Sequence, residues 1–245
     1  MTVSIILPTY NERENIVPLI KAIDRCVRFD HEIIVVDDNS PDGTSRVVRA
    51  YIGQSENRSI RIVTRTRDRG LTRSIRHGIQ VARGNIIVWM DCDFSMPPSV
   101  IPKLLDKIGE GYDIAVGSRY ISGGSAKEGS VRDSWIGILL SEVMNVGLRL
   151  LMGRKFHDYT SGFVAVKRNV FHSIHLSGDY GEYFIDFIVH AYRKGYAICE
   201  IPYASKPRRA GESKTGKNIG EYIWRGRKYA WTIFKLLIEP YVSEI

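Results

Sequence analysis

Residues 33–43 read IIVVDDNSPDG and give the strongest indication of the fold class. The stretch opens with four β-branched apolar residues, a pattern typical of a strand in a sheet that is covered on both faces. It continues with residues that favour a turn at the end of that strand. Residues 86–93, IIVWMDCD, also place polar residues directly after a very apolar run. Both stretches predict buried strands that end at polar clusters.

Short apolar runs alternate with longer segments of helical character through the first half of the chain. The runs that we interpret as strands are residues 3–7, 32–36, 60–64, 86–90 and 114–116. This alternation predicts an α/β fold with a mostly parallel sheet flanked by helices, whose ligands bind beyond the carboxyl ends of the strands. We therefore expect a site at the polar clusters 8–12, 37–43, 91–93 and 117–120.

The second half of the chain continues without a linker. It contains an apolar helix at about 133–151, a strand at 162–166, a helix around 184–192 and a strand at 197–201. A basic loop over 205–217 then precedes an aromatic and basic segment, 219–242. We expect one catalytic domain over residues 1–217, and a C-terminal amphipathic helix over 218–245 that contacts a membrane or a partner protein.

The composition narrows the class of protein. The 245 residues include 35 Lys and Arg against 27 Asp and Glu, so the formal net charge is +8. This charge suits nucleic acid, an anionic membrane or a phosphorylated small molecule. Three widely spaced cysteines form neither a disulfide framework nor a zinc motif, which favours a reducing compartment. The start of the chain has no secretory pattern, and the apolar segments contain Glu142 and Lys235, so we expect a cytosolic protein without a spanning helix.

Two pairs of aspartates are candidate binding residues. Asp91 and Asp93 would repel each other unless a cation joined them, and Mg²⁺ typically binds one or two carboxylates together with substrate phosphates. Such a pair after a strand can also be a simple turn. Asp37 and Asp38 begin a turn too, but a turn does not require both of them. A carboxylate there could accept hydrogen bonds from the N–H groups of a nucleotide base.

Seven motifs, taken in order, resemble the family-2 glycosyltransferases of GT-A fold. The similarity is closest to dolichol-phosphate mannose synthases and related polyprenyl-phosphate glycosyltransferases, and it runs from residue 3 to about residue 214. The motifs are LPTYNE (7–12), VVDDNSPDGT (35–44), RGL (69–71), DCD (91–93), GSRY (117–120), TSGF (160–163) and RRAGESK (208–214).

The resemblance implies a role for each matching residue. The donor nucleotide would be held by Pro8, Tyr10, Glu12, Val36, Asp38, Asp91, Cys92 and Asp93. Mg²⁺ or Mn²⁺ would be bound by Asp91, Asp93 and Ser95. Phosphate groups, including that of the acceptor, would be bound by Arg119, Arg132, Ser141, Arg208 and Lys214. The catalytic set would be Asp91, Asp93, Arg119 and Arg208, and Asp158 belongs to a turn that lies near the active site in the family or serves only as a cap.

The chain departs from the family pattern at two positions. Met96 stands where the family usually has His, and Gly137 stands where it tends to have the arginine that precedes Ser141 by four residues. Arg132 is the nearest arginine upstream of Gly137 and is a candidate to replace it.

The resemblance implies an inverting, metal-dependent transfer of mannose from GDP-mannose to dolichyl or polyprenyl phosphate. We expect a peripheral protein on the cytosolic face of a membrane, held by the membrane surface or by an anchoring protein partner. One alternative is the same reaction with UDP-glucose or UDP-GlcNAc. Another is a sugar-nucleotide sensor without activity. A basic nucleic-acid-binding protein would leave both aspartate pairs unexplained, so we expect no nucleic acid partner.

Overall fold

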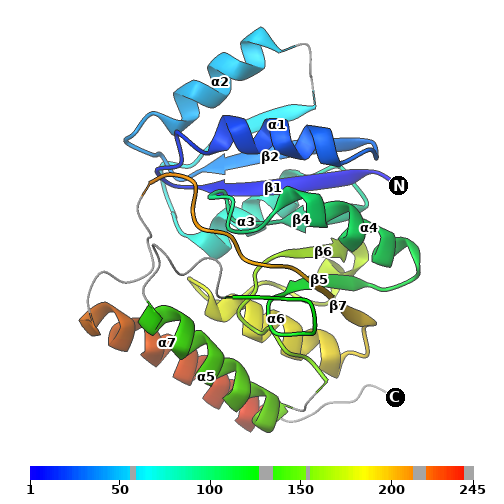
Figure 1. Cartoon of the computed structure of the whole chain (residues 1–245), viewed down its shortest axis with the longest axis vertical. Coiled ribbons are helices and arrows are strands. Elements are labelled where there is room, and N and C mark those ends of the chain that lie inside the picture. The colour runs from blue at the N-terminus through cyan, green and yellow to red at the C-terminus, as the bar shows by residue number, and fades with distance from the viewer. Residues whose placement is uncertain (56–58, 127–134, 153–154, 212–218, 240–245) are drawn as a thin grey trace.

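A computed structural model describes residues 1–55, 59–126, 135–152, 155–211 and 219–239, and these form a sheet flanked by helices (Figure 1). The strands are β1 (Val3–Thr9), β2 (His31–Asp37), β3 (Ile60–Thr64), β4 (Ile86–Trp89), β5 (Ile114–Ser118), β6 (Val164–Lys167) and β7 (Ile198–Pro202). The α-helices are α1 (Ile16–Cys26), α2 (Thr44–Gln54), α3 (Leu71–Val81), α4 (Ile101–Gly109), α5 (Trp135–Met152), α6 (Glu182–Arg193) and α7 (Ile219–Ile238). Two short 3₁₀ helices are η1 (Pro98–Val100) and η3 (Arg168–His172).

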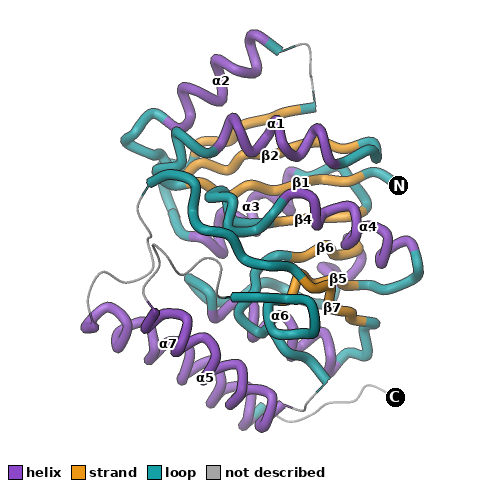
Figure 2. Tube along the Cα trace, viewed as in Figure 1, coloured by secondary structure: helices purple, strands orange, loops and turns teal. Residues whose placement is uncertain are grey.

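The seven strands of the described residues form one sheet in the order β3-β2-β1-β4-β6-β5-β7. All neighbouring strands are parallel except β6, which is antiparallel to both β4 and β5. The carboxyl ends of β1, β2, β4 and β5 therefore face the same edge of the sheet, and loops gather there (Figure 2). This edge is where the sequence predicts the site.

The sheet is covered on both faces because successive side chains of a strand point to opposite sides. On β1, Ile5 and Leu7 pack in one core cluster with α1, α2 and α4, whereas Ile6 packs in the other with α3 and α6. The second cluster also buries Leu148 of α5 and Leu236 of α7. Burial on both sides explains why the central strands are apolar at every position.

The predicted fold class is confirmed, and all seven strands were predicted within a few residues of their ends. The antiparallel insertion of β6 between β4 and β5 was not predicted. A C-terminal helix, α7, is present, and the domain boundary at residue 217 lies outside the described residues, so it stays a prediction. Among the described residues, none of the helices combines the length and hydropathy needed to cross a bilayer.

Candidate active site

Asp37 holds the turn after β2. It is fully buried, and its carboxylate accepts hydrogen bonds from Thr9 Oγ1 at 3.0 Å and Ser45 Oγ at 2.7 Å. It also accepts the backbone N–H of Ser40 at 3.1 Å and the Ser40 hydroxyl. The turn has left-handed backbone at Asn39 and Gly43, with φ of 56° and 85°. Asp37 therefore stabilises the turn, and Asp38 is the residue of this pair that can bind a ligand.

Asp38 points to the loop that precedes α3. Its Oδ1 accepts Arg65 Nη1 at 2.9 Å and Ser74 Oγ at 2.7 Å, and its Oδ2 accepts the Gly70 N–H at 2.7 Å. Arg65 is nearly buried, with 9% of its side chain exposed, and it donates to the backbone oxygen of Asp68 as well. An ionised carboxylate has about four acceptor positions, so three internal bonds leave Asp38 room for one more donor.

The loop after β1 contributes Tyr10 and Glu12. Tyr10 is 41% exposed at the sheet edge, whereas Glu12 is buried and accepts Asn15 Nδ2 at 2.7 Å. The backbone N–H of Glu12 donates to Thr44 Oγ1 at 3.0 Å, which ties this loop to the start of α2. A buried carboxylate needs a charge partner, and Arg208 supplies it with Nη1 at 3.0 Å from Glu12 Oε1.

Asp91 follows β4 and opens to solvent at the sheet edge. The protein atoms crowded around it, together with the charge of Asp93, raise the pKa of its carboxyl to about 7. Its backbone N–H donates to the Met96 sulfur at 3.3 Å, so buried Met96 supports this loop from the side of the core. Asp91 is therefore a carboxylate whose charge is costly until a cation or another positive group approaches it.

Asp93 is buried and bonds to the chain on two sides. Its Oδ1 accepts the backbone N–H of Ser95 at 2.9 Å, and its Oδ2 lies 2.8 Å from Arg208 Nη2. Arg208 thus joins Glu12 and Asp93, which come from the ends of β1 and β4. The two carboxylates hold the pKa of Arg208 above its ordinary value despite its partial burial.

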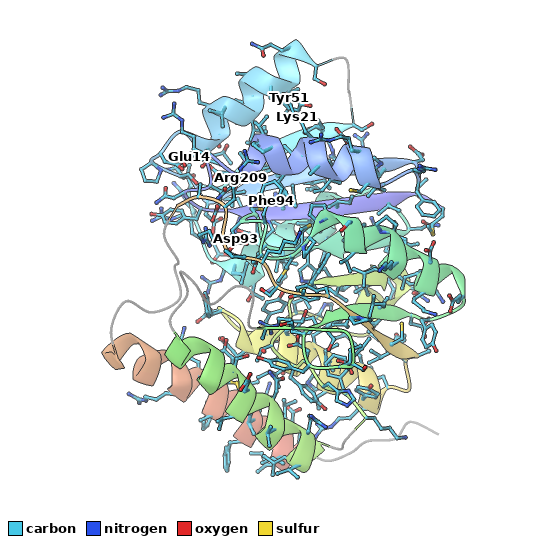
Figure 3. All side chains as sticks on the ribbon, in the orientation of Figure 1. Glu14, Lys21, Tyr51, Asp93, Phe94 and Arg209 are labelled. Carbon is cyan, nitrogen blue, oxygen red and sulfur yellow. The ribbon has the colours of Figure 1, made fainter. Side chains whose placement is uncertain are left out.

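Residues 203–211, here called the return segment, run from β7 back across the strand ends (Figure 2). Lys206 N–H donates to Ser95 O, and Arg209 N–H to Asp93 O, both at 3.0 Å. The Arg209 guanidinium carbon lies 5.4 Å from the centre of the Phe94 ring, and Figure 3 shows these two residues beside Asp93. The segment therefore carries two arginines to the aspartate pair from the far end of the sheet.

Arg119 follows β5 and is fixed by a carboxylate. Its backbone N–H and Nε donate to Asp158 Oδ2, both at 2.9 Å, and its Nη2 donates to Asp158 Oδ1 at 2.8 Å and Thr160 Oγ1 at 2.9 Å. Burial lowers the pKa of the guanidinium, but the charge and hydrogen bonds of fully buried Asp158, together with Tyr203 and Tyr120, raise that pKa well above its usual value. Arg119 is thus a fixed positive charge.

Ser141 of α5 belongs to the same cluster. Its hydroxyl is 3.0 Å from Tyr120 Oη and 2.9 Å from Thr160 Oγ1. The Arg119 guanidinium carbon also lies 5.3 Å from the centre of the Tyr120 ring. Arg119 and Ser141, predicted as phosphate ligands from distant parts of the chain, are therefore brought together.

Several predicted ligands are less exposed than Tyr10 and Asp91, or lie outside the described residues. The side chains of Val36 and Cys92 lie in the core, and Cys92 Sγ contacts Pro8 O at 3.3 Å, so these two residues can face a nucleotide only with their backbone. Pro8 itself is half-buried within β1, and Ser95 is half-buried beside Asp93. Arg132 and Lys214 lie outside the described residues. The predicted ligand roles all stay predictions.

Sequence reasoning did not single out Arg65 or Ser74, which hold Asp38. Neither residue belongs to a motif, and Arg65 is 27 positions from its partner. The only signal was the cluster of arginines before Gly70, whose backbone N–H makes the third bond to Asp38.

The donor atoms at this edge fit a hard divalent cation. Asp91 and Asp93 offer carboxylate oxygens, and the described residues contain no group of three or more His, Cys, Asp or Glu that could hold a metal ion on their own. Mg²⁺ binds in this way when substrate phosphates complete its coordination. The arrangement therefore suits a cation that arrives with a phosphorylated ligand.

Comparison with known proteins identifies relatives over most of the chain. Residues 4–174 match the model of glycosyl transferase family 2. A dolichol-phosphate mannosyltransferase of Pyrococcus furiosus is 35% identical over 225 residues, which are 91% of this chain and 62% of the relative. A polyprenol monophosphomannose synthase of Mycolicibacterium smegmatis is 35% identical over 228 residues, 90% of this chain and 84% of the relative. This chain thus spans less than two thirds of the length of the Pyrococcus protein.

Solved structures share the fold at low identity. Glucosyl-3-phosphoglycerate synthase of Mycobacterium tuberculosis, in complex with Mn²⁺, UDP-glucose and phosphoglyceric acid, has a TM-score of 0.73 and 20% identity, covering 98% of this chain and 80% of that one. Its complex with Mg²⁺ and UDP gives a TM-score of 0.72. These similarities establish the fold, and both complexes of that synthase contain a divalent cation.

Proposed function

The chain belongs to glycosyl transferase family 2, and from this premise we propose that it transfers mannose from GDP-mannose to the phosphate of a polyprenyl or dolichyl lipid. The observation that carries the proposal is the identity of 35% to a polyprenol monophosphomannose synthase over 90% of the chain. The cluster of Asp91, Asp93, Arg119 and Arg208 at one sheet edge supports it, because both substrates are phosphorylated.

The reaction needs positioning and charge neutralisation more than a general base. A phosphate monoester has a second pKa near 6, so a lipid phosphate is already a nucleophile at neutral pH. Arg119 provides a fixed guanidinium for phosphate oxygens, and Arg208 brings a second one to the aspartate pair. These residues would align the acceptor oxygen with the anomeric carbon and hold the leaving diphosphate.

Asp91 and Asp93 are the residues that would hold Mg²⁺ or Mn²⁺. When bound, such a cation stabilises negative charge on the diphosphate as it leaves. Asp38 would accept a hydrogen bond from the base, because one of its acceptor positions remains for a ligand. Displacement in a single step inverts the anomeric centre, so an α-linked donor gives a β-linked product.

The acceptor is a lipid, so we propose that the protein works at the cytosolic face of a membrane. Helix α7 exposes Trp231, Phe234, Leu237 and Ile238, and Lys228 and Lys235 lie on the same helix. Helix α5 exposes Val143, Val146, Leu150 and Leu151. Apolar side chains with basic neighbours are typical of helices that lie in the membrane interface.

Sedimentation with anionic vesicles of phosphatidylcholine and phosphatidylglycerol tests the membrane contact. We expect the double substitution Trp231→Ser and Phe234→Ser to remove vesicle binding, and Phe29→Ser, which alters an exposed aromatic side chain between α1 and β2, to leave it unchanged. Absence of binding by the unaltered protein would instead favour an anchoring protein partner.

Transfer of radiolabelled sugar to polyprenyl phosphate tests the reaction. The purified protein is offered GDP-mannose, UDP-glucose or UDP-GlcNAc, each with Mg²⁺, Mn²⁺ or EDTA. We expect label in the chloroform phase from GDP-mannose alone, and none with EDTA. Label from a UDP-sugar would retain the mechanism and change the donor, whereas absence of lipid-linked label from every donor would contradict the proposed function.

A further inference from the structure

Arg119 owes its position to a turn outside its own strand. The turn spans residues 157–161, between α5 and β6, and Asp158 and Thr160 within it receive the guanidinium. Three of the four bonds of Arg119 use Nε and Nη2 and the fourth uses its backbone N–H. Among the described residues, Nη1 makes no hydrogen bond and remains for a ligand. Any shift of the turn would therefore redirect the Nη1 donors.

Glu200 of β7 holds this turn from the sheet. Its Oε1 accepts the Asp158 backbone N–H at 3.1 Å, and its Oε2 accepts the His157 backbone N–H at 2.9 Å. The His157 ring nitrogen Nδ1 also lies 2.8 Å from Oε2. Only 8% of the Glu200 side chain is exposed. Because Glu200 pairs with Val116 in the sheet, it is anchored to β5, the strand that leads to Arg119.

Asn145 of α5 holds the next residues of the same turn. Its Oδ1 accepts the Tyr159 backbone N–H at 2.7 Å, and its Nδ2 donates to Thr160 Oγ1 at 2.9 Å. The residue is 2% exposed. Three consecutive backbone N–H groups, those of residues 157–159, are thus received by two buried side chains from different elements.

We propose that Glu200 is a positioning residue of the reaction, which holds residues 157–161 so that Asp158 directs Arg119 Nη1 toward a phosphate. Asn145 of α5 holds the same turn, and we call Glu200 and Asn145 together the clamp. The inference rests on the proposed function only in taking phosphate as the ligand of Arg119. Glu200 belongs to none of the seven sequence motifs, and it is 42 positions away from Asp158 in the sequence.

The clamp requires a carboxylate rather than a polar side chain of similar size. Both oxygens of Glu200 accept backbone N–H groups, whereas a glutamine offers only one oxygen. In Glu200→Gln, the amide N–H₂ would face a backbone N–H, and two donors cannot bond. One N–H of the turn then loses its acceptor in a nearly buried place.

Glu32 provides a matched control at the other end of the sheet. Its Oε1 accepts the Arg83 backbone N–H at 2.6 Å and Ser4 Oγ at 2.7 Å, and Arg61 pairs with its Oε2. Glu32→Gln also replaces one oxygen of a partly buried carboxylate, but it acts on β2 away from Arg119. Its remaining oxygen can still accept the Arg83 N–H, and the lost oxygen is the one that faces Arg61.

The experiment titrates the full chain with farnesyl phosphate by calorimetry and follows amide hydrogen exchange of the free protein. We expect Glu200→Gln to weaken binding about tenfold, the size expected for one misdirected charge-assisted bond. In an Arg119→Met background, the same change should have no further effect, since Glu200 acts through Arg119. Exchange should rise at residues 156–161 in Glu200→Gln. It should stay unchanged there in Glu32→Gln, which should bind farnesyl phosphate normally.

Unchanged affinity in Glu200→Gln, or an equal loss in the Arg119→Met background, would overturn the inference. If Glu200→Gln does not fold, Asn145→Asp takes its place, because it retains the acceptor for Tyr159 and loses the donor to Thr160; unchanged affinity there would overturn the clamp as well. If the unaltered protein binds no farnesyl phosphate, the proposed function fails. The exchange data then decide the inference separately, and unchanged exchange at residues 156–161 in the variant would refute it.

Discussion

Two pairs of aspartates lie on either side of β1, and they differ in how much of their hydrogen-bonding capacity the protein itself uses. Asp37, the last residue of β2, and Asp38 receive seven bonds from hydroxyl, guanidinium and backbone donors. Asp91, after β4, opens to solvent with a pKa raised to about 7, and Asp93 is paired with Arg208. The first pair builds the scaffold of the site, whereas the second pair offers a ligand the carboxylate of Asp91, which forms no ion pair among the described residues.

The largest expected effect is on activity at the second pair. Asp93→Asn removes a charge beside Asp91 and leaves the shape of the side chain. We expect kcat to fall about 10²–10³-fold, a typical cost of losing one preorganised electrostatic group. Initial rates of sugar transfer measure this, with the thermal unfolding midpoint as a control for folding. A variant that retained more than about a tenth of the activity would have lost at least tenfold less than this typical cost, and it would contradict the assignment.

The next effect is on stability at the first pair. Asp37→Asn places an amide donor among hydroxyl and N–H donors in a fully buried position. We expect the free energy of unfolding to fall by about 2–4 kcal/mol, because hydrogen bonds to a charged group are lost and a donor is left without an acceptor. Urea denaturation measures the change. Exposed Asp106→Asn is the control, and equal stability of the two variants would show that Asp37 does not hold the turn.

A smaller effect is expected at Arg65, which holds Asp38. In Arg65→Lys, one ammonium replaces a guanidinium that bonds to Asp38, Ser74 and the Asp68 backbone. We expect the KM for the donor to rise about tenfold with kcat little changed, because the ground state and the transition state lose the same contact. Arg61→Lys, at an ion pair on β3 with Glu32, is the control. A fall in kcat without a change in KM would place Arg65 in the chemistry instead.

The smallest effect concerns pH. The raised pKa of Asp91, about 7, means that its carboxyl is protonated at lower pH, and a carboxylate must lose its proton to bind a cation. Affinity for Mn²⁺ in the presence of GDP should therefore fall about fourfold from pH 8 to pH 6.5, as one proton competes with the metal. Electron paramagnetic resonance of free Mn²⁺ follows this. An affinity that does not change with pH would show that Asp91 is not a ligand.

The fold was predictable because the information is local. Runs such as residues 33–36 and 86–90 are short, rich in β-branched residues and apolar at every position, which is typical of a strand buried on both faces. The antiparallel place of β6 was not predictable, since four residues of β6 carry no sign of which strands they join. Pairing partners are a property of the whole sheet.

The site was predictable as a set of motifs but not as a network. Arg208 reaches Glu12 across 196 positions, and Glu200 holds a turn 42 positions away. Neither contact leaves a periodic pattern or a spacing that can be read along the chain. The different roles of Asp37 and Asp38 were not predictable either. They depend on which carboxylate contacts Thr9 and Ser45 and which contacts Arg65.

The most direct test of the account is the structure of the product. The protein is incubated with GDP-mannose, Mg²⁺ and polyprenyl phosphate, and the lipid phase is analysed by mass spectrometry and by NMR of the anomeric carbon. Direct displacement at the aspartate pair after β4 predicts a single hexose joined to the lipid phosphate in the β configuration. An α-linked product would contradict the single displacement, and a lipid phase without mannosyl phosphate would contradict the proposed reaction.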